Sequence, residues 1–184
     1  MTLSPRGRNL ALTAHVAASV GWLGAVSGAL VLAVAGATST DAETVRASYL
    51  ALELLATFAL VPLAFASLVT GVIQSLGSTW GLFRHYWVLA KLSINLFATL
   101  VLLLYLPTLG RLADLAAETP AADDLATLST ASPALHAGAA LLLLLVAIVL
   151  AVFKPRGMTP YGWRKQRERR AGAETGAGGG DHPG

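Results

Sequence analysis

The sequence predicts an all-α integral membrane protein, a bundle of four transmembrane helices. Its 184 residues are 55% hydrophobic and only 12% charged, with a mean hydropathy of +0.64, whereas soluble domains are about 25% charged. The apolar residues gather in four stretches, and a helix crossing the ~30 Å hydrocarbon core needs about 20 residues. Strands are excluded because a lone apolar strand leaves its backbone groups unpaired in lipid.

The four expected helices cover residues 10–36, 49–75, 86–109 and 134–153. Their ionisable residues are His15, Glu53, Lys91 and His136, respectively. The first stretch is longer than the roughly 7–15 apolar residues of a signal-peptide core, so we expect a retained anchor. Residues 1–9 precede the bundle. Residues 154–184 form a tail that is first basic and then Gly-rich, and we expect its end (171–184) to be flexible.

Three connections join the helices. We expect turn or capping residues at Thr38–Thr40, a tight turn over 76–85, and a long loop over 110–133 with room for a short surface helix. Pro62 lies within the second stretch, where it removes a backbone hydrogen bond and should kink the helix.

Lys and Arg are distributed unevenly between the two sides of a four-crossing bundle. One side carries Arg6, Arg8, Arg84 and the basic tail, while the other carries only Arg46 and Arg111, among several carboxylates. The positive-inside rule therefore places both termini in the cytoplasm. We expect a multi-pass protein of the inner (cytoplasmic) membrane. The run Arg164–Arg170 follows a membrane helix closely, so we expect it to meet anionic lipid headgroups rather than nucleic acid.

Polar residues fall on one face of each of the first three helices, at 100° per residue. These faces hold His15, Ser19 and Trp22 in the first helix, Glu53, Thr57, Ser67, Gly71 and Gln74 in the second, and Arg84, Lys91, Asn95, Thr99 and Tyr105 in the third. Ionisable groups in lipid are unfavourable by ~2.5–3.5 kcal/mol at a helix centre. We therefore expect these faces to point into the bundle.

Depth sorts the candidate site residues into two layers, roughly 15–20 Å apart at 1.5 Å per residue. The inner layer contains His15, Gln74 and Lys91, with His85 at its mouth; the outer layer contains Glu53, Tyr105 and His136. We expect Lys91 and His15 to exchange hydrogen bonds, directly or through water. Simpler structural roles stay open: an interhelical hydrogen bond for His15, a helix-dipole role for Glu53, and snorkelling for Lys91.

Two membrane histidines in a four-helix bundle also raise the possibility of a b-type haem. His15 and His136 belong to opposite leaflets, so only His15 with His85 could ligate one iron. The chain has no cysteine, which excludes disulfides and thiolate metal sites.

Small residues form a ladder along the first helix. Gly24 and Gly28 make a GxxxG motif, and Gly21, Ala25, Ala29 and Ala33 extend it. Such residues let helix backbones approach closely. We expect the ladder to pack within the bundle, with homodimerisation through Gly24 and Gly28 as the alternative.

The segments HVAASVGWLGAV (15–26) and WGLFRHYWVLAKL (80–92) resemble a bacterial family of small four-helix membrane proteins without assigned activity. A fainter similarity, in the histidine and Trp-Leu-Gly pattern, is to copper-resistance protein D-like membrane domains. The resemblance implies the fold and no catalytic residue. Three functions remain: a non-enzymatic structural or binding subunit, which we favour; a haem- or quinone-linked redox protein; and a small transporter or proton pathway.

Overall fold

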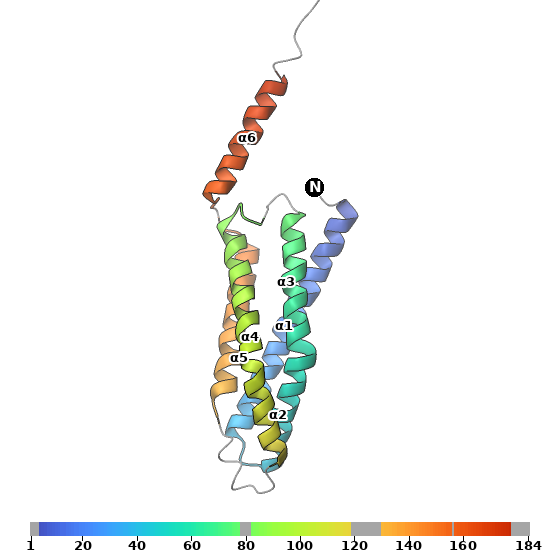
Figure 1. Ribbon diagram of the computed structural model, residues 1–184, viewed down its shortest axis with the longest axis vertical. Helices are drawn as coiled ribbons and strands as arrows, with labels where there is room; N and C mark the ends of the chain where they lie inside the picture. The colour runs from blue at the N-terminus through green and yellow to red at the C-terminus, as the bar shows by residue number, and fades with distance from the viewer. Residues whose placement is uncertain (1–3, 78–81, 119–129, 156, 178–184) are drawn as a thin grey trace, which may run out of the picture.

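A computed structural model describes residues 4–77, 82–118, 130–155 and 157–177, except for the side chains of 169 and 173–177 (Figure 1). The described chain is a helical bundle, as the sequence predicts. Four continuous helical segments are long and apolar enough to cross a membrane: Pro5–Thr38, Ala42–Leu76, Tyr86–Glu118 and Ser132–Phe153. The protein is therefore an all-α membrane protein.

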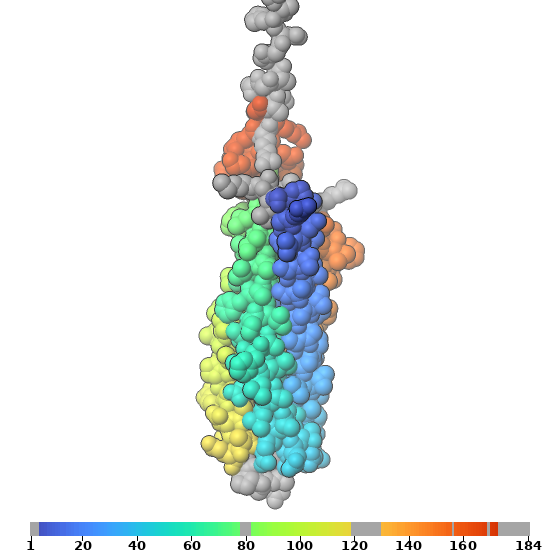
Figure 2. All heavy atoms as spheres, turned by 90° about the vertical axis from the view of Figure 1, so that its right-hand side faces the viewer, coloured from blue at the N-terminus to red at the C-terminus, as the bar shows by residue number. Residues whose placement is uncertain are grey.

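The helices form a four-membered ring with up-and-down connections. The first span is α1 (Pro5–Thr38), and the second combines α2 (Ala42–Leu55), η1 (Ala56–Leu60) and α3 (Val61–Leu76). The other two are α4 (Tyr86–Glu118) and α5 (Ser132–Phe153). Both α1 and α4 contact the second span on one side and α5 on the other. Figure 2 shows the first two spans side by side along a narrow rod.

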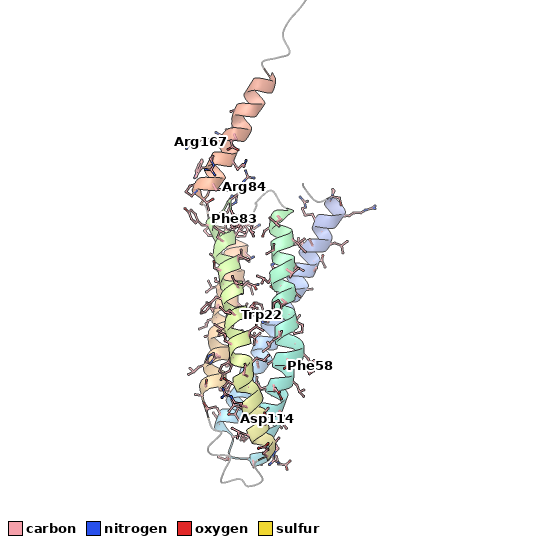
Figure 3. All side chains as sticks on the ribbon, in the orientation of Figure 1. Trp22, Phe58, Phe83, Arg84, Asp114 and Arg167 are labelled. Atoms are coloured by element: carbon pink, nitrogen blue, oxygen red, sulfur yellow. The ribbon has the colours of Figure 1, made fainter. Side chains whose placement is uncertain are left out.

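The two ends of the bundle carry different charges. We call the end with Arg6, Arg8, Arg84 and Lys154 the basic end, and the end with Asp41, Glu43, Asp114 and Glu118 the acidic end. The start of α1 and the tail helix α6 (Pro160–Ala177) lie together at the basic end (Figure 1). Arg84 and Asp114 mark the two ends in Figure 3.

Helices α2 and α4 extend beyond the apolar stretches at the acidic end. The expected loop over 110–133 is wrong in its first part, because Gly110–Glu118 continues α4. Its residues Ala113 and Ala116 are buried, and Arg46 Nε donates a hydrogen bond to the Ala116 carbonyl at 2.9 Å. Charged residues indicate where the membrane ends, whereas a helix continues as long as one of its faces packs against a neighbouring helix. Residues 119–129 of that loop, with Pro120, lie outside the described residues, as does Gly81 of the expected turn, while Ser132 and Pro133 already belong to the last span.

The start of α2 is likewise earlier than expected. Asp41 is its N-cap and accepts hydrogen bonds from the Thr44 backbone N–H and hydroxyl, at 2.9 and 2.6 Å. These bonds hold the pKa of the Asp41 carboxyl below its usual range, the hydroxyl bond contributing most. The turn between α1 and α2 is therefore fixed by Asp41 together with Ser39 of the expected group, whose Oγ accepts the Asp41 N–H at 3.1 Å.

A wide turn interrupts the second span just before Pro62. In η1 the Val61 N–H bonds to the Ala56 carbonyl, a π-type i→i+5 bond. Proline has no N–H and its ring clashes with the preceding turn, and this wide turn relieves the clash. The extra residue shifts the helical register. Thr57 is consequently exposed, and its predicted place on the inward face is wrong, whereas Ser67 beyond the turn is buried.

The core contains aromatic side chains against small residues. Trp22 is 2% exposed and Tyr49 1% exposed, and Figure 3 shows Trp22 inside the bundle and Phe58 pointing outward. A Cβ atom on Gly36 would lie 3.2 Å from Tyr49 Cζ, so a side chain here would press on the buried Tyr49 ring. The packing role predicted for Gly24 is wrong: it is exposed, and a Cβ there meets nothing within 4 Å. The helix turns its Gly21, Ala25, Ala29 and Ala33 side inward instead.

The tail is more ordered than expected, because α6 continues to Ala177. Thr159 fastens it to the bundle: its hydroxyl donates to the Phe83 carbonyl at 2.6 Å, and its N–H to the Arg84 carbonyl at 3.0 Å. The same hydroxyl oxygen accepts the Gly162 N–H at 3.1 Å, which caps the first turn of α6. A Cβ on Gly162 would lie 2.5 Å from the Arg84 carbonyl oxygen, so only glycine allows this approach.

Candidate functional site

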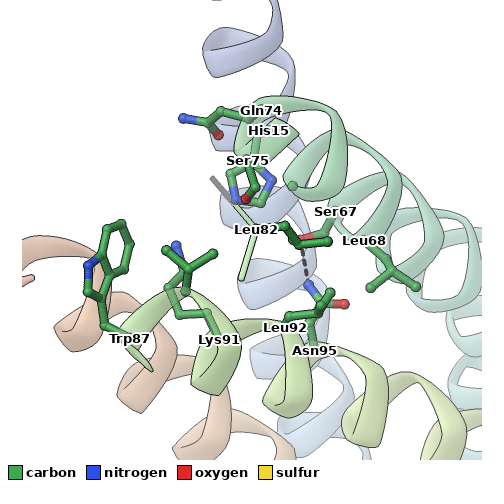
Figure 4. Close-up of a pocket in the computed structure, with 12 residues that line it drawn as sticks. His15, Ser67, Leu68, Gln74, Ser75, Leu82, Trp87, Lys91, Leu92 and Asn95 are labelled. Carbon is green, nitrogen blue, oxygen red and sulfur yellow. Dashed lines mark hydrogen bonds between the residues drawn. The ribbon is translucent and has the colours of Figure 1, made fainter. Parts of the chain in front are cut away.

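A polar cavity of about 120 Å³ lies between α1, α3 and α4 near the basic end (Figure 4). We call it the inner cavity. It brings together four of the predicted site residues, His15, Gln74, Lys91 and Asn95. Its other lining residues are Ser67, Leu68, Gly71, Ser75, Leu82, Trp87, Val88 and Leu92. No residue of α5 is among those that line it.

The position of His15 is fixed by α3. Its Nδ1 lies 3.2 Å from Thr70 Oγ1, and the Thr70 hydroxyl donates its proton to the Ala66 carbonyl. Because the hydroxyl has one proton, Nδ1 must be the donor to Thr70. The neutral ring then keeps Nε2 as a hydrogen-bond acceptor on the cavity side (Figure 4). A Cβ on Gly71 would lie 3.0 Å from His15 Cε1, so glycine makes room for the ring.

Lys91 brings a positive charge into the same cavity. Its Nζ lies 5.9 Å from the centroid of the Trp87 ring, one turn earlier on α4, at the outer limit of a cation–π contact. None of the described residues that line the cavity is acidic. No direct hydrogen bond joins Lys91 to His15 in the described part of the chain, since His15 bonds to Thr70 instead. A contact through water stays a prediction.

A hydrogen-bonded group of three side chains closes the deep end of the inner cavity. Ser67 Oγ accepts the Asn95 Nδ2–H at 3.0 Å (Figure 4). It also lies 3.0 Å from Ser19 Oγ. This polar triad joins α3, α4 and α1. The oxygen of the same amide, Asn95 Oδ1, is buried without a partner within the described structure. The predicted polar faces of these three helices therefore meet at one level.

His85 is not part of this cavity. Its backbone pairs with Met158 beside the attachment of α6, and its ring lies 6.4 Å from that of Trp87. The inner cavity is also smaller than the ~150 Å³ of an engineered cavity that holds one benzene molecule. A haem with His15 and His85 as ligands does not fit this arrangement. Across the described residues, no three His, Asp or Glu side chains are grouped to hold a metal ion.

Two of the three outer-layer residues meet. The rings of Tyr105 and His136 stack with centroids 3.9 Å apart and an interplanar angle of 16°. The Tyr105 hydroxyl donates to Ser132 Oγ at 2.9 Å. Glu53 is elsewhere: its carboxylate lies beside Gly110 of α4, 3.8 Å from where a Cβ would be. No ion pair joins Glu53 to His136 among the described residues.

Thr70 and Trp87 are not among the site residues predicted from the sequence. Both carried a signal: Thr70 is three residues from Ser67 on one helix face, and Trp87 is four residues from Lys91. Comparisons with protein-family models, with curated protein sequences and with solved structures find no match to this chain. The function must therefore be argued from the cavity itself.

Proposed function

We propose that this protein is a membrane-embedded binding protein whose inner cavity holds a phosphate monoester group. The observation that supports this is Lys91, an ammonium group in a cavity whose described lining includes no carboxylate. A charge inside a membrane protein is stabilised by a partner of opposite charge. A bound anion would supply that partner.

The other polar groups favour phosphate over a simple carboxylate. Lys91 Nζ offers N–H donors, and Gln74 brings an amide that can donate as well. His15 Nε2, in contrast, is an acceptor in the neutral ring. A phosphate monoester near its second pKa of about 6 has both acceptor oxygens and a P–OH donor. The small volume suits such a headgroup better than a quinone ring or a haem, the redox alternatives.

The phosphate could belong to a lipid or to a soluble molecule, and a stability assay distinguishes them. The unfolding temperature of the detergent-purified protein is measured with phosphatidic acid, phosphatidylglycerol, phosphatidylcholine or inorganic phosphate, because a ligand of the folded state raises it. We expect phosphatidic acid to raise it most if the ligand is a lipid, and inorganic phosphate to match it if the ligand is soluble.

Lys91→Met should abolish the shift. Lys165→Met is the matched control: it removes one charge at the same end of the molecule, but Lys165 is exposed on α6, bonded to Glu168 at 2.8 Å. An equal shift in wild type and Lys91→Met, or no shift with any phosphate, would refute the proposal. A shift that Lys165→Met removes instead would assign the effect to the basic run Arg164–Arg170, which we propose meets anionic headgroups.

We further propose that the basic end faces the cytoplasm of the inner membrane. The asymmetry of Lys and Arg between the ends supports it. Reporter fusions after Gly184 and within the 119–129 segment should report opposite compartments, with the fusion after Gly184 cytoplasmic. The reverse orientation, or one compartment for both fusions, would contradict this topology.

A further inference from the structure

A second cavity, of about 240 Å³, lies among α1, α2, α4 and α5, and we call it the outer cavity. It is larger than the ~150 Å³ cavity that accommodates benzene. Trp22 lines it at the centre of the bundle, and Tyr105 and His136 line it near the acidic end. Phe97, His136 and Ala139 are exposed, so the cavity opens sideways between α4 and α5, where the membrane is.

The lining selects a neutral, mainly apolar ligand. It contains no charged side chain among the described residues, and aliphatic residues, aromatic residues and alanines make up nearly all of it. A void of this size deprives its walls of contacts. The surrounding lipid offers apolar molecules that could restore those contacts through the lateral opening.

The polar end of the cavity offers a hydrogen-bond acceptor. His136 Nδ1 lies 2.8 Å from the Ser132 carbonyl oxygen, which can only accept, so Nδ1 carries a proton. In the neutral ring Nε2 is therefore an acceptor, and no hydrogen bond to it occurs in the described structure. Stacking on Tyr105 holds the ring in place.

We propose that the outer cavity binds a neutral membrane amphiphile with a hydroxyl group. The hydroxyl would donate to His136 Nε2, and the apolar part would extend toward Trp22. Ala98 and Tyr105 both line the cavity on α4 and are seven residues apart, which is about 10 Å along the helix. This site is separate from the inner cavity and does not depend on the proposed phosphate ligand.

Fluorescence of Trp22 tests the proposal. In a full-length variant with Trp80, Trp87 and Trp163 replaced by Phe, 8-bromooctan-1-ol should quench Trp22 saturably, because the heavy bromine atom reaches the indole. Its methyl ether has no hydroxyl donor and should bind roughly two- to tenfold more weakly, as expected for one hydrogen bond. His136→Phe keeps the ring stacking and should make the two probes bind equally.

Ala98→Leu should abolish saturable quenching by filling the cavity, whereas Ala17→Leu, on the exposed face of α1, should not. The proposal is overturned if alcohol and ether bind equally to the protein with His136 intact. It is also overturned if saturable quenching is absent, or if it survives in Ala98→Leu.

Discussion

Replacing Ser67 with Ala should destabilise the bundle measurably, because it breaks both bonds of the polar triad. Ser67 is 2% exposed, and its Oγ lies 3.0 Å from both Asn95 Nδ2 and Ser19 Oγ. Interhelical hydrogen bonds in membrane proteins contribute about 0.6 kcal/mol on average and at most about 1.7. Asn95 would also lose its bond while its Oδ1 already lacks a partner. We expect a loss of about 1–3 kcal/mol in the free energy of unfolding.

A double-mutant cycle isolates this contribution. In an Asn95→Leu background the buried amide is gone, so Ser67→Ala should remove only the bond to Ser19, about 0.6 kcal/mol. Reversible unfolding in mixed micelles of increasing SDS fraction gives the four free energies. The reasoning fails if Ser67→Ala changes stability by less than about 0.3 kcal/mol, or if the two substitutions are additive within the ~0.5 kcal/mol of independent sites.

Three further predictions concern the packing, the tail and the acidic end. Gly36→Leu should lower the free energy of unfolding by about 1–3 kcal/mol through overpacking, while Gly24→Leu should change it by less than about 0.5 kcal/mol; a large effect at Gly24 would mean that this face has a partner. Thr159→Val should accelerate amide exchange in α6 and leave the bundle amides unchanged, since it removes both the cap and the hydroxyl bond to the Phe83 carbonyl; unaltered exchange in α6 would contradict this. Asp41 has a lowered pKa, so it stabilises the α2 start above its unfolded pKa of 3.8, and that stability is lost as pH falls through the folded pKa; acidification should lower the protection factor of the Thr44 amide, which corrects for the intrinsic exchange rate at each pH, and an equal decrease in Asp41→Asn would contradict the assignment.

The four spans could be predicted because hydrophobicity within a membrane is a direct physical requirement. The ends of the helices could not be predicted from hydropathy. A helix ends where its residues no longer pack against a neighbour or where a capping residue terminates it, and hydropathy reports neither. Residues Ala113 and Ala116 continue α4 past Arg111 because they pack, and Asp41 starts α2 because it caps.

The residues of the inner cavity could be predicted from the sequence because a helix has a constant rotation and a constant rise per residue. His15, Lys91 and Asn95 needed only 100° and 1.5 Å per residue to be placed together. The same rule misplaced Thr57, since a π-type turn before Pro62 changes the register locally. Gly24 was misplaced for another reason. The small residues cover more of the surface of α1 than the neighbouring helices contact, and only those helices determine which of the small residues face inward.

The polar triad separates the two cavities, which bears on whether the two proposed ligands bind independently. On α4 the inner cavity ends at Asn95 and the outer cavity begins at Phe97; on α1 His15 lines the first and Trp22 the second, with Ser19 between them. One amphiphile with its headgroup at Lys91 and its chain at Trp22 would have to pass through the hydrogen bonds of Ser67. The two sites should therefore fill independently, and phosphate should leave the quenching of Trp22 unchanged.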